Sequence, residues 1–339
     1  VDECHRTQSG KLHKLMKSYL KDSIFIGFTG TPLLKKDKKT SIETFGKYIH
    51  RYLLDEAVTD KVILDIVYEA RDVDQFLGSK DRIDQWFDSK TKNLNKWQKI
   101  SLKKKWTTMQ SILSSESRSI RIVNDIIFDF SIKPRLCTDR GTAMLVANNI
   151  FEACRYYELF NKTELKDKCA IITSYNPNAS HISLEDTGAN SESDKEFIFN
   201  TYEKILKDIS SDPNKTKSET YEDNAKKKFK KEPHNMKLLI VVDKLLTGFD
   251  APSCTYLYID KSMQDHALFQ AICRTNRLDG EDKDFGYIVD YKDLLKSVEK
   301  AISVYTSDLD NSSDKKNIEI NIYDKFQKDK EKLENTLKS

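Results

Sequence analysis

The 339-residue chain lacks several features that would assign it to common protein classes. It has no apolar run near the roughly 20 residues that a membrane-spanning helix needs, so we expect no membrane partner. It also has no C-x-x-C pair and no histidine at zinc-binding spacing from a cysteine. We therefore expect reduced, mostly buried thiols in a cytoplasmic protein. The six cysteines are Cys4, Cys137, Cys154, Cys169, Cys254 and Cys273.

A strong net charge is absent as well. Lysine and arginine total 57 against 54 aspartates and glutamates, which gives a net charge of +3. Global charge therefore does not indicate a nucleic-acid partner, although it is compatible with a local basic surface. At roughly 150 residues per domain, the length predicts about two domains. Because the chain begins with Val1 and its first residues already form a motif, we expect a fragment of a longer protein.

Short apolar runs alternate with helical segments beyond about residue 140. This alternation predicts a parallel sheet with helices on both faces. The expected strands are 143–147, 170–173, 238–242, 256–259 and 287–289, and the expected helices are 150–160, 265–274 and 291–304. The exception is 176–236, which is polar and lysine-rich and predicts an insertion or helical excursion.

The first part of the chain has a different pattern. Residues 22–29 form a short apolar run that ends at Gly30-Thr31-Pro32, which predicts a buried parallel strand running into a loop. A second run, 62–68, predicts a strand between two lobes. From about residue 72 to 130 the apolar positions recur with helical periodicity, which predicts a helical connector.

Two groups of residues carry the chemistry. Asp2 and Glu3 form an acidic pair at the end of an expected strand, where they could hold a metal and order a water molecule. Gln270, Arg274 and Arg277 have the spacing i, i+4, i+7, so on a helix their side chains leave one face together. An acidic pair and two fixed positive charges suggest phosphoryl chemistry that is divided between two lobes.

Four segments in this order resemble motifs II, III, V and VI of superfamily 2 helicases and translocases. They are Asp2-Glu3-Cys4-His5-Arg6, Thr29-Gly30-Thr31-Pro32, Leu246 to Pro252, and Gln270 to Arg277. The variant is most similar to the restriction (R, motor) subunit of type I restriction–modification enzymes. The resemblance implies an α/β fold: RecA-like parallel sheets with flanking helices, comprising part of lobe 1 plus lobe 2, and helical connecting and C-terminal segments.

The resemblance also implies a division of the chain. We expect the C-terminal part of the first lobe at 1–70, the helical connector at 71–130 and the second lobe at 131–295, with the polar insertion 176–236 inside it. The start of a C-terminal helical region would occupy 296–339.

Roles follow motif by motif. Asp2 resembles the residue that holds Mg²⁺, and Glu3 the base that orients the attacking water. Arg274 and Arg277 resemble arginine fingers that stabilise charge on a phosphoryl group. Gln270 would contact His5 or the nucleotide.

The remaining motif residues line the nucleotide or the DNA. Thr29 and Thr31 resemble motif III, which couples the nucleotide state to lobe closure, although a capped strand-to-helix turn explains them equally. Gly248 permits close backbone approach, and Asp250 could accept from a ribose or from a finger arginine. Thr247 could donate to a DNA phosphate. Asn148 and Ser174 would contact phosphate at strand ends, with ordinary loop capping as the alternative.

The implied function is an ATP-dependent translocase on double-stranded DNA that drives cleavage at a distance, with Mg²⁺ as the metal and the methyltransferase (M) and specificity (S) subunits as partners. The sequence contains no G-x-x-x-x-G-K-[ST] phosphate loop and no nuclease motif, so both would lie upstream and the isolated chain would be inactive. The alternatives are another superfamily 2 motor, such as a type III restriction subunit or a repair helicase, and a non-catalytic docking fragment.

Overall fold

The computed structural model describes residues 1–2, 4, 11–30, 45–71, 117–177, 188, 192–210 and 213–306. Their centre is a six-stranded sheet with the order β1-β6-β5-β2-β4-β3. Every neighbouring pair in it is parallel. The strands are β1 (Asp65–Ala70), β2 (Thr142–Ala147), β3 (Cys169–Ile172), β4 (Leu238–Val241), β5 (Cys254–Asp260) and β6 (Phe285–Asp290).

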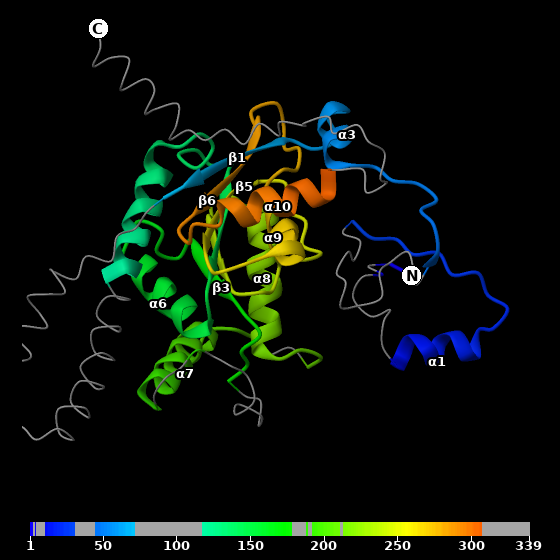
Figure 1. The fold of residues 1–339 in the computed structure, drawn as a ribbon. Coiled ribbons are helices and arrows are strands. Elements are labelled where there is room, and N and C mark those ends of the chain that lie inside the picture. Colours follow the sequence, from blue (N-terminus) through cyan, green and yellow to red (C-terminus); the bar gives the residue numbers. More distant parts are fainter. Residues whose placement is uncertain are drawn as a thin grey trace, which may run out of the picture.

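Helices cover both faces of this sheet, as Figure 1 shows. One apolar core lies under α6 (Ile150–Phe160), α7 (Glu192–Leu206) and a helix at 117–132. The other core lies under four helices. They are α3 (Leu54–Thr59), α8 (Lys217–Lys231), α9 (Asp265–Ile272) and α10 (Leu295–Thr306). The strands β2, β3, β4 and β5 are buried along their whole length, which is why they are predominantly apolar instead of alternating.

Local sequence explains where two of these helices begin. The Asn149 side chain accepts a hydrogen bond from the backbone N–H of Glu152 at 2.8 Å and so caps the start of α6. Thr216 and Glu219 form a reciprocal capping box at the start of α8. Such caps satisfy backbone N–H groups that have no partner inside the helix.

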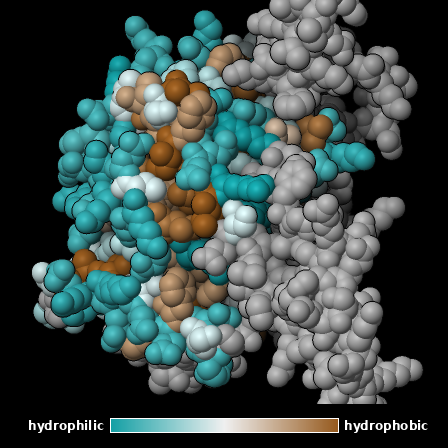
Figure 2. Space-filling view, turned by 90° about the vertical axis from the view of Figure 1, so that its left-hand side faces the viewer, coloured by the Kyte–Doolittle hydropathy of each residue, from teal (hydrophilic) through white to brown (hydrophobic). Residues whose placement is uncertain are grey.

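The outer face of the helix at 117–132 is partly apolar. Figure 2 looks onto the side of the molecule where this helix lies in Figure 1, and hydrophobic surface interrupts the hydrophilic surface there. Ile120, Phe128 and Ile132 of this helix are exposed. On the opposite face of the same helix, Asp129 is buried and accepts hydrogen bonds from Arg71 and Tyr258.

The predicted fold class is confirmed: the chain is α/β, with a RecA-like parallel sheet between helical layers. All five strands and all three helices that the sequence predicted beyond residue 140 are present. No helix among the described residues is long and apolar enough to span a membrane.

Two observations bear on the expected division of the chain. The strand β1, expected between the lobes and before a boundary at residue 70, is an edge strand of this same sheet and pairs with β6. The segment 176–236 is not a mere excursion, because its helices α7 and α8 cover opposite faces of the sheet. They bury Ile198 and Tyr202 on one side and Ala225 and Phe229 on the other.

The described residues 1–2, 4 and 11–30, with α1 (Lys11–Tyr19), lie apart from the sheet in Figure 1. The backbone of Val1 donates to Ile26 at 2.7 Å and accepts from Phe28 at 2.8 Å, which is the hydrogen-bond pattern of a parallel pair. The run 22–29 was expected to be buried, and this is wrong, since Ile24 is 92% and Phe28 63% exposed. Cys4 contacts the same segment, since its N–H donates to the carbonyl of Phe28 at 3.1 Å.

Candidate functional site

An open pocket of about 490 Å³ lies beside the residues that precede β1, β5 and β6. It brings together the segments expected to be motifs V and VI. Leu54, Val62, Ile63, Asp250, Cys273, Arg274, Asn276, Arg277 and Leu278 line it.

The end of α9 shapes this pocket. The helix ends at Ile272, with Cys273 as its C-cap. The chain then turns and becomes extended, because the carbonyl of Asn276 accepts from the N–H of Leu64 at 2.7 Å and Arg277 forms an antiparallel bridge with Ile63. The expectation that three side chains leave one continuous helix face is therefore wrong. A turn, held by residues just before β1, presents the two arginines instead.

Arg274 connects the two motifs through backbone atoms. Its guanidinium donates to the carbonyl of Phe249 at 2.6 Å and to the carbonyl of Gln270 at 3.0 Å. Burial lowers the pKa of Arg274, and the neighbouring charge of Arg277 lowers it further. The side chain stays charged even so, because the guanidinium pKa is ordinarily far above neutral. The carbonyl oxygens partly replace the water that the half-buried cation has lost.

Arg277 is more accessible. Its guanidinium forms an ion pair with the carboxylate of Asp250. The side chain of Arg277 is 33% exposed and that of Asp250 is 56% exposed, so both groups face solvent at the pocket. The pair shows that a guanidinium at this position can be reached by an anion.

The other motif residues occupy three different places. Asn148 and Ser174 are exposed just after β2 and β3, so they lie at the carboxyl-terminal edge of the sheet. Thr247 and Gly248 lie in the connection from β4 to β5, where Gly248 has φ +70° and open space around its α-carbon. Gln270 is buried in α9, at 8% exposure.

Of the expected motif II and III site residues, the structure describes Asp2 and Thr29, and neither lines this pocket. Asp2 follows Val1, which pairs with Ile26 and Phe28, and Thr29 follows Phe28; the part of the chain that contains them lies apart from α9 in Figure 1. Glu3, His5 and Thr31 lie outside the described residues. Within the described ranges, no group of three or more metal-binding side chains forms.

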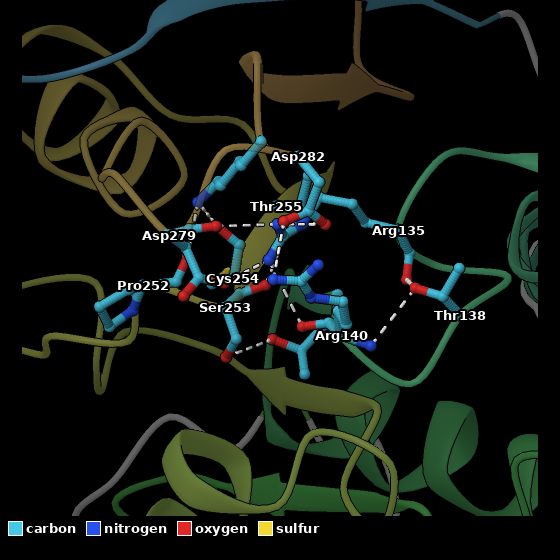
Figure 3. A network of polar contacts seen from close by, with 12 residues as sticks. Arg135, Thr138, Arg140, Pro252, Ser253, Cys254, Thr255, Asp279 and Asp282 are labelled. Atoms are coloured by element: carbon cyan, nitrogen blue, oxygen red, sulfur yellow. Dashed lines mark hydrogen bonds and ion pairs between the residues drawn. The ribbon is translucent and has the colours of Figure 1, made fainter. Parts of the chain in front are cut away.

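A polar network surrounds the buried Arg135 (Figure 3). The guanidinium of Arg135 donates to the carbonyl of Asp279 at 3.0 Å and forms ion pairs with the carboxylates of Asp279 and Asp282. Arg135 itself is 5% exposed and has φ +64°. These contacts fix the loop that follows Arg277.

Lys283 is the second cation of this network. It is 3% exposed, and its ammonium donates to the carbonyls of Pro252 and Cys254 at 2.6 and 2.8 Å. Burial lowers the pKa of Lys283 to about 8. Neither Arg135 nor Lys283 was expected from the sequence, because each is a single basic residue in a charged stretch. The nearness of Lys283 to motif VI was the one available signal.

Comparisons with known proteins agree with these motifs. Residues 139–293 match a family model described as type I restriction enzyme subunit R domain 3. Residues 1–100 match a model described as SWI2/SNF2 ATPase. The range 1–100 contains the segments that resemble motifs II and III, and the range 139–293 contains those that resemble motifs V and VI.

Relatives match along nearly the whole chain. The type I restriction enzyme HindI endonuclease subunit of Haemophilus influenzae is 31% identical, over 98% of this chain and 30% of its own length. The SauCOLORF180P endonuclease subunit of Staphylococcus aureus strain COL is 28% identical, over 97% of this chain and 34% of its own length. The chain thus spans about a third of the length of these curated relatives.

A solved structure is also similar. It is a fragment of a candidate HsdR subunit of a type I restriction enzyme from Vibrio vulnificus YJ016. It is 17% identical with a TM-score of 0.48, over 90% of this chain and 45% of that chain.

Proposed function

We propose that this chain, which belongs to the family of type I restriction enzyme R subunits, is part of an ATP-dependent motor that translocates double-stranded DNA. In the full-length subunit, this motion would drive cleavage at a distance from the recognition site. The M and S subunits would supply methylation and sequence choice. The match of residues 139–293 favours the type I assignment over other superfamily 2 motors.

The observation that carries the proposal is the pocket at which motifs V and VI meet. Two guanidinium groups line it, and one of them, Arg277, already binds a carboxylate there. A planar, permanently charged guanidinium is suited to a phosphoryl group that gains charge in the transition state. The open volume of about 490 Å³ leaves room for the phosphates of a nucleotide.

ATP would be the fuel in this proposal, and Mg²⁺ would neutralise phosphate charge when bound. Asp2 would hold Mg²⁺ through its water shell, and Glu3 would order the attacking water. Arg277 would approach the γ-phosphate from the second lobe once the lobes close. Asp250 would release Arg277 to the phosphate, because a polyanionic phosphate is the stronger ligand for a guanidinium.

The DNA backbone would run along a different part of the sheet. Asn148 and Ser174 lie at the carboxyl-terminal edge, whereas Arg274 and Arg277 lie beside residues that precede β1, β5 and β6. This separation supports a division of labour in which one end of the sheet contacts phosphate backbone and the other contacts nucleotide. Backbone contacts are independent of sequence, as a translocase requires.

Displacement of a triplex-forming strand from a distant DNA site tests the proposal. The assembled enzyme should displace the strand only with ATP and Mg²⁺, after a lag that grows with the distance to the recognition site. A repair helicase would separate the duplex strands instead, and a docking fragment would leave displacement unchanged when Arg277 is replaced. Displacement without a distance-dependent lag would contradict translocation.

A further inference from the structure

The backbone of motif V is held by cationic side chains that follow it in the sequence. Arg274 donates to the carbonyl of Phe249, and Lys283 donates to the carbonyls of Pro252 and Cys254. Asp250, which pairs with Arg277, lies between these anchors. Three carbonyl groups within six residues therefore depend on two cations from the region of motif VI and the loop after it.

Lys283 is an unusual choice for a purely structural role. A buried ammonium is costly unless it is paired, and no carboxylate within the described ranges forms an ion pair with it. Its ammonium donates instead to two backbone carbonyl oxygens. A methionine or leucine could fill similar space without that cost. Unlike those apolar side chains, the lysine forms directional hydrogen bonds with the backbone at the end of motif V.

The loop that carries Lys283 is itself fixed. Arg135 binds the carboxylates of Asp279 and Asp282, and its Nε donates to the hydroxyl of Thr255 at 3.2 Å (Figure 3). Thr255 is the second residue of β5, so Arg135 joins the loop after Arg277 to the start of that strand. Lys283 then extends the same connection to the end of motif V.

We propose that Lys283 is a positioning residue for ATP hydrolysis, which holds motif V in the place where Asp250 and Arg277 meet the nucleotide. This inference rests on the proposed function of the pocket. In this proposal Lys283 does not contact the nucleotide, and it acts through the carbonyls of Pro252 and Cys254. A shift of about 1 Å in a catalytic arrangement can reduce the rate roughly a hundredfold, so such a residue matters although it is remote from the chemistry.

A second buried lysine provides the matched control. Lys237 is 6% exposed and also donates to backbone carbonyls, those of Thr138 and Gly141. Its partners precede β2 and do not belong to motif V or VI. Replacement of either lysine by methionine removes a buried ammonium from carbonyl oxygens. Only Lys283→Met removes it from motif V.

The experiment is a double-mutant cycle on DNA-stimulated ATP hydrolysis in the full-length, assembled enzyme. The variants are Lys283→Met, Lys237→Met, Arg277→Ala and the two doubles that combine a lysine change with Arg277→Ala. We expect Lys283→Met to lower kcat at least about tenfold, with a melting temperature close to that of Lys237→Met. In the Arg277→Ala background, Lys283→Met should have little further effect on kcat, because residues that act as one unit are not additive.

The outcomes separate the two proposals. An unchanged kcat in Lys283→Met, or equal losses in both lysine variants, would overturn the positioning role while leaving the pocket assignment intact. A normal kcat in Arg277→Ala would instead contradict the proposed function of the pocket. Where Lys283→Met does not yield folded protein, Lys283→Gln replaces it in the cycle, and the same kcat comparison applies.

Discussion

Arg277 forms an ion pair with Asp250, and this contact joins the turn after α9 to the segment before β5. The two residues come from motifs that are far apart in the sequence and meet at the rim of one pocket. Both remain partly exposed, so an incoming anion can compete with Asp250 for the guanidinium. Exposed ion pairs contribute little to stability, about 0–1 kcal/mol, so the pair is easily exchanged.

Arg277→Ala should reduce DNA-stimulated ATP hydrolysis by about a thousandfold or more, the range of arginine fingers. Arg277→Lys should not restore the rate, because an ammonium lacks the planar fork. Steady-state phosphate release from the full-length enzyme measures both. DNA binding without nucleotide should change little. Weaker DNA binding with a reduced salt slope, combined with normal hydrolysis, would make this residue a DNA contact instead.

Arg274 and Arg277 should differ in their effect on stability. Arg274→Ala leaves the partly buried carbonyl of Phe249 without its guanidinium donor, at a cost of about 1–3 kcal/mol. The melting temperature should therefore fall by several degrees in Arg274→Ala and hardly at all in Arg277→Ala. Differential scanning calorimetry compares them. Equal melting temperatures would show that the Arg274 contact with Phe249 is not a structural one.

Glu3→Gln in the full-length protein should stop turnover and leave ATP binding nearly intact. The amide keeps the size of the side chain but cannot accept the proton of the attacking water. ATP affinity by fluorescence titration, measured beside the hydrolysis rate, separates the two steps. If both fall together, Glu3 is needed for the structure and not for the orientation of water.

The sequence was sufficient to predict the strands of the sheet beyond residue 140, because those strands carry a strong signal. Segments such as 238–242 are short and apolar throughout, which is typical of a parallel strand covered on both faces. The helix at 150–160 was equally clear, and the structure places it at Ile150–Phe160. Both signals are local, so no knowledge of distant partners was required.

Features that depend on distant contacts were missed. The helix α8 carries few apolar residues, and its buried face is revealed by Ala225 and Phe229, four residues apart. In α7 the same spacing relates the buried residues Ile198, Tyr202 and Leu206. The end of α9 was placed too late, because the extended residue Arg277 is held by Ile63, far away in the sequence. Lys283 was missed as well, because its partners, the carbonyls of Pro252 and Cys254, come from another segment of the chain.

Purified alone, this chain should show no DNA-stimulated ATP hydrolysis. Its sequence contains no G-x-x-x-x-G-K-[ST] loop, so the backbone cradle and the lysine for the β- and γ-phosphates are absent from it. A phosphate-release assay with linear DNA provides the measurement. Glu3→Ala serves as the control for contaminating ATPases. Turnover that is lost in that variant would show that the chain is an ATPase by itself.

Thiol reactivity should single out Cys137 among the cysteines. Cys137 is exposed, whereas Cys4, Cys154, Cys169 and Cys254 are buried and Cys273 is half-buried. Burial raises the pKa of Cys169 and Cys254 to about 12 and that of Cys273 to about 11. At pH 8 these thiols stay protonated, and the thiolate is the reactive form. An aromatic disulfide reagent should thus modify Cys137 first, and Cys137→Ser should remove the fast phase.

The same raised thiol pKa values determine whether alkaline pH raises or lowers the stability of the fold. A thiol whose pKa is raised on folding contributes stability that is fully present below its unfolded pKa of about 8.5. As pH rises further, the unfolded chain ionises first, so this stability is lost progressively until the folded pKa near 11 to 12 is reached. Urea midpoints should therefore fall from pH 8.5 upwards. Cys169→Ala should flatten that decline, and an unchanged slope in this variant would mean that its thiol ionises equally in both states.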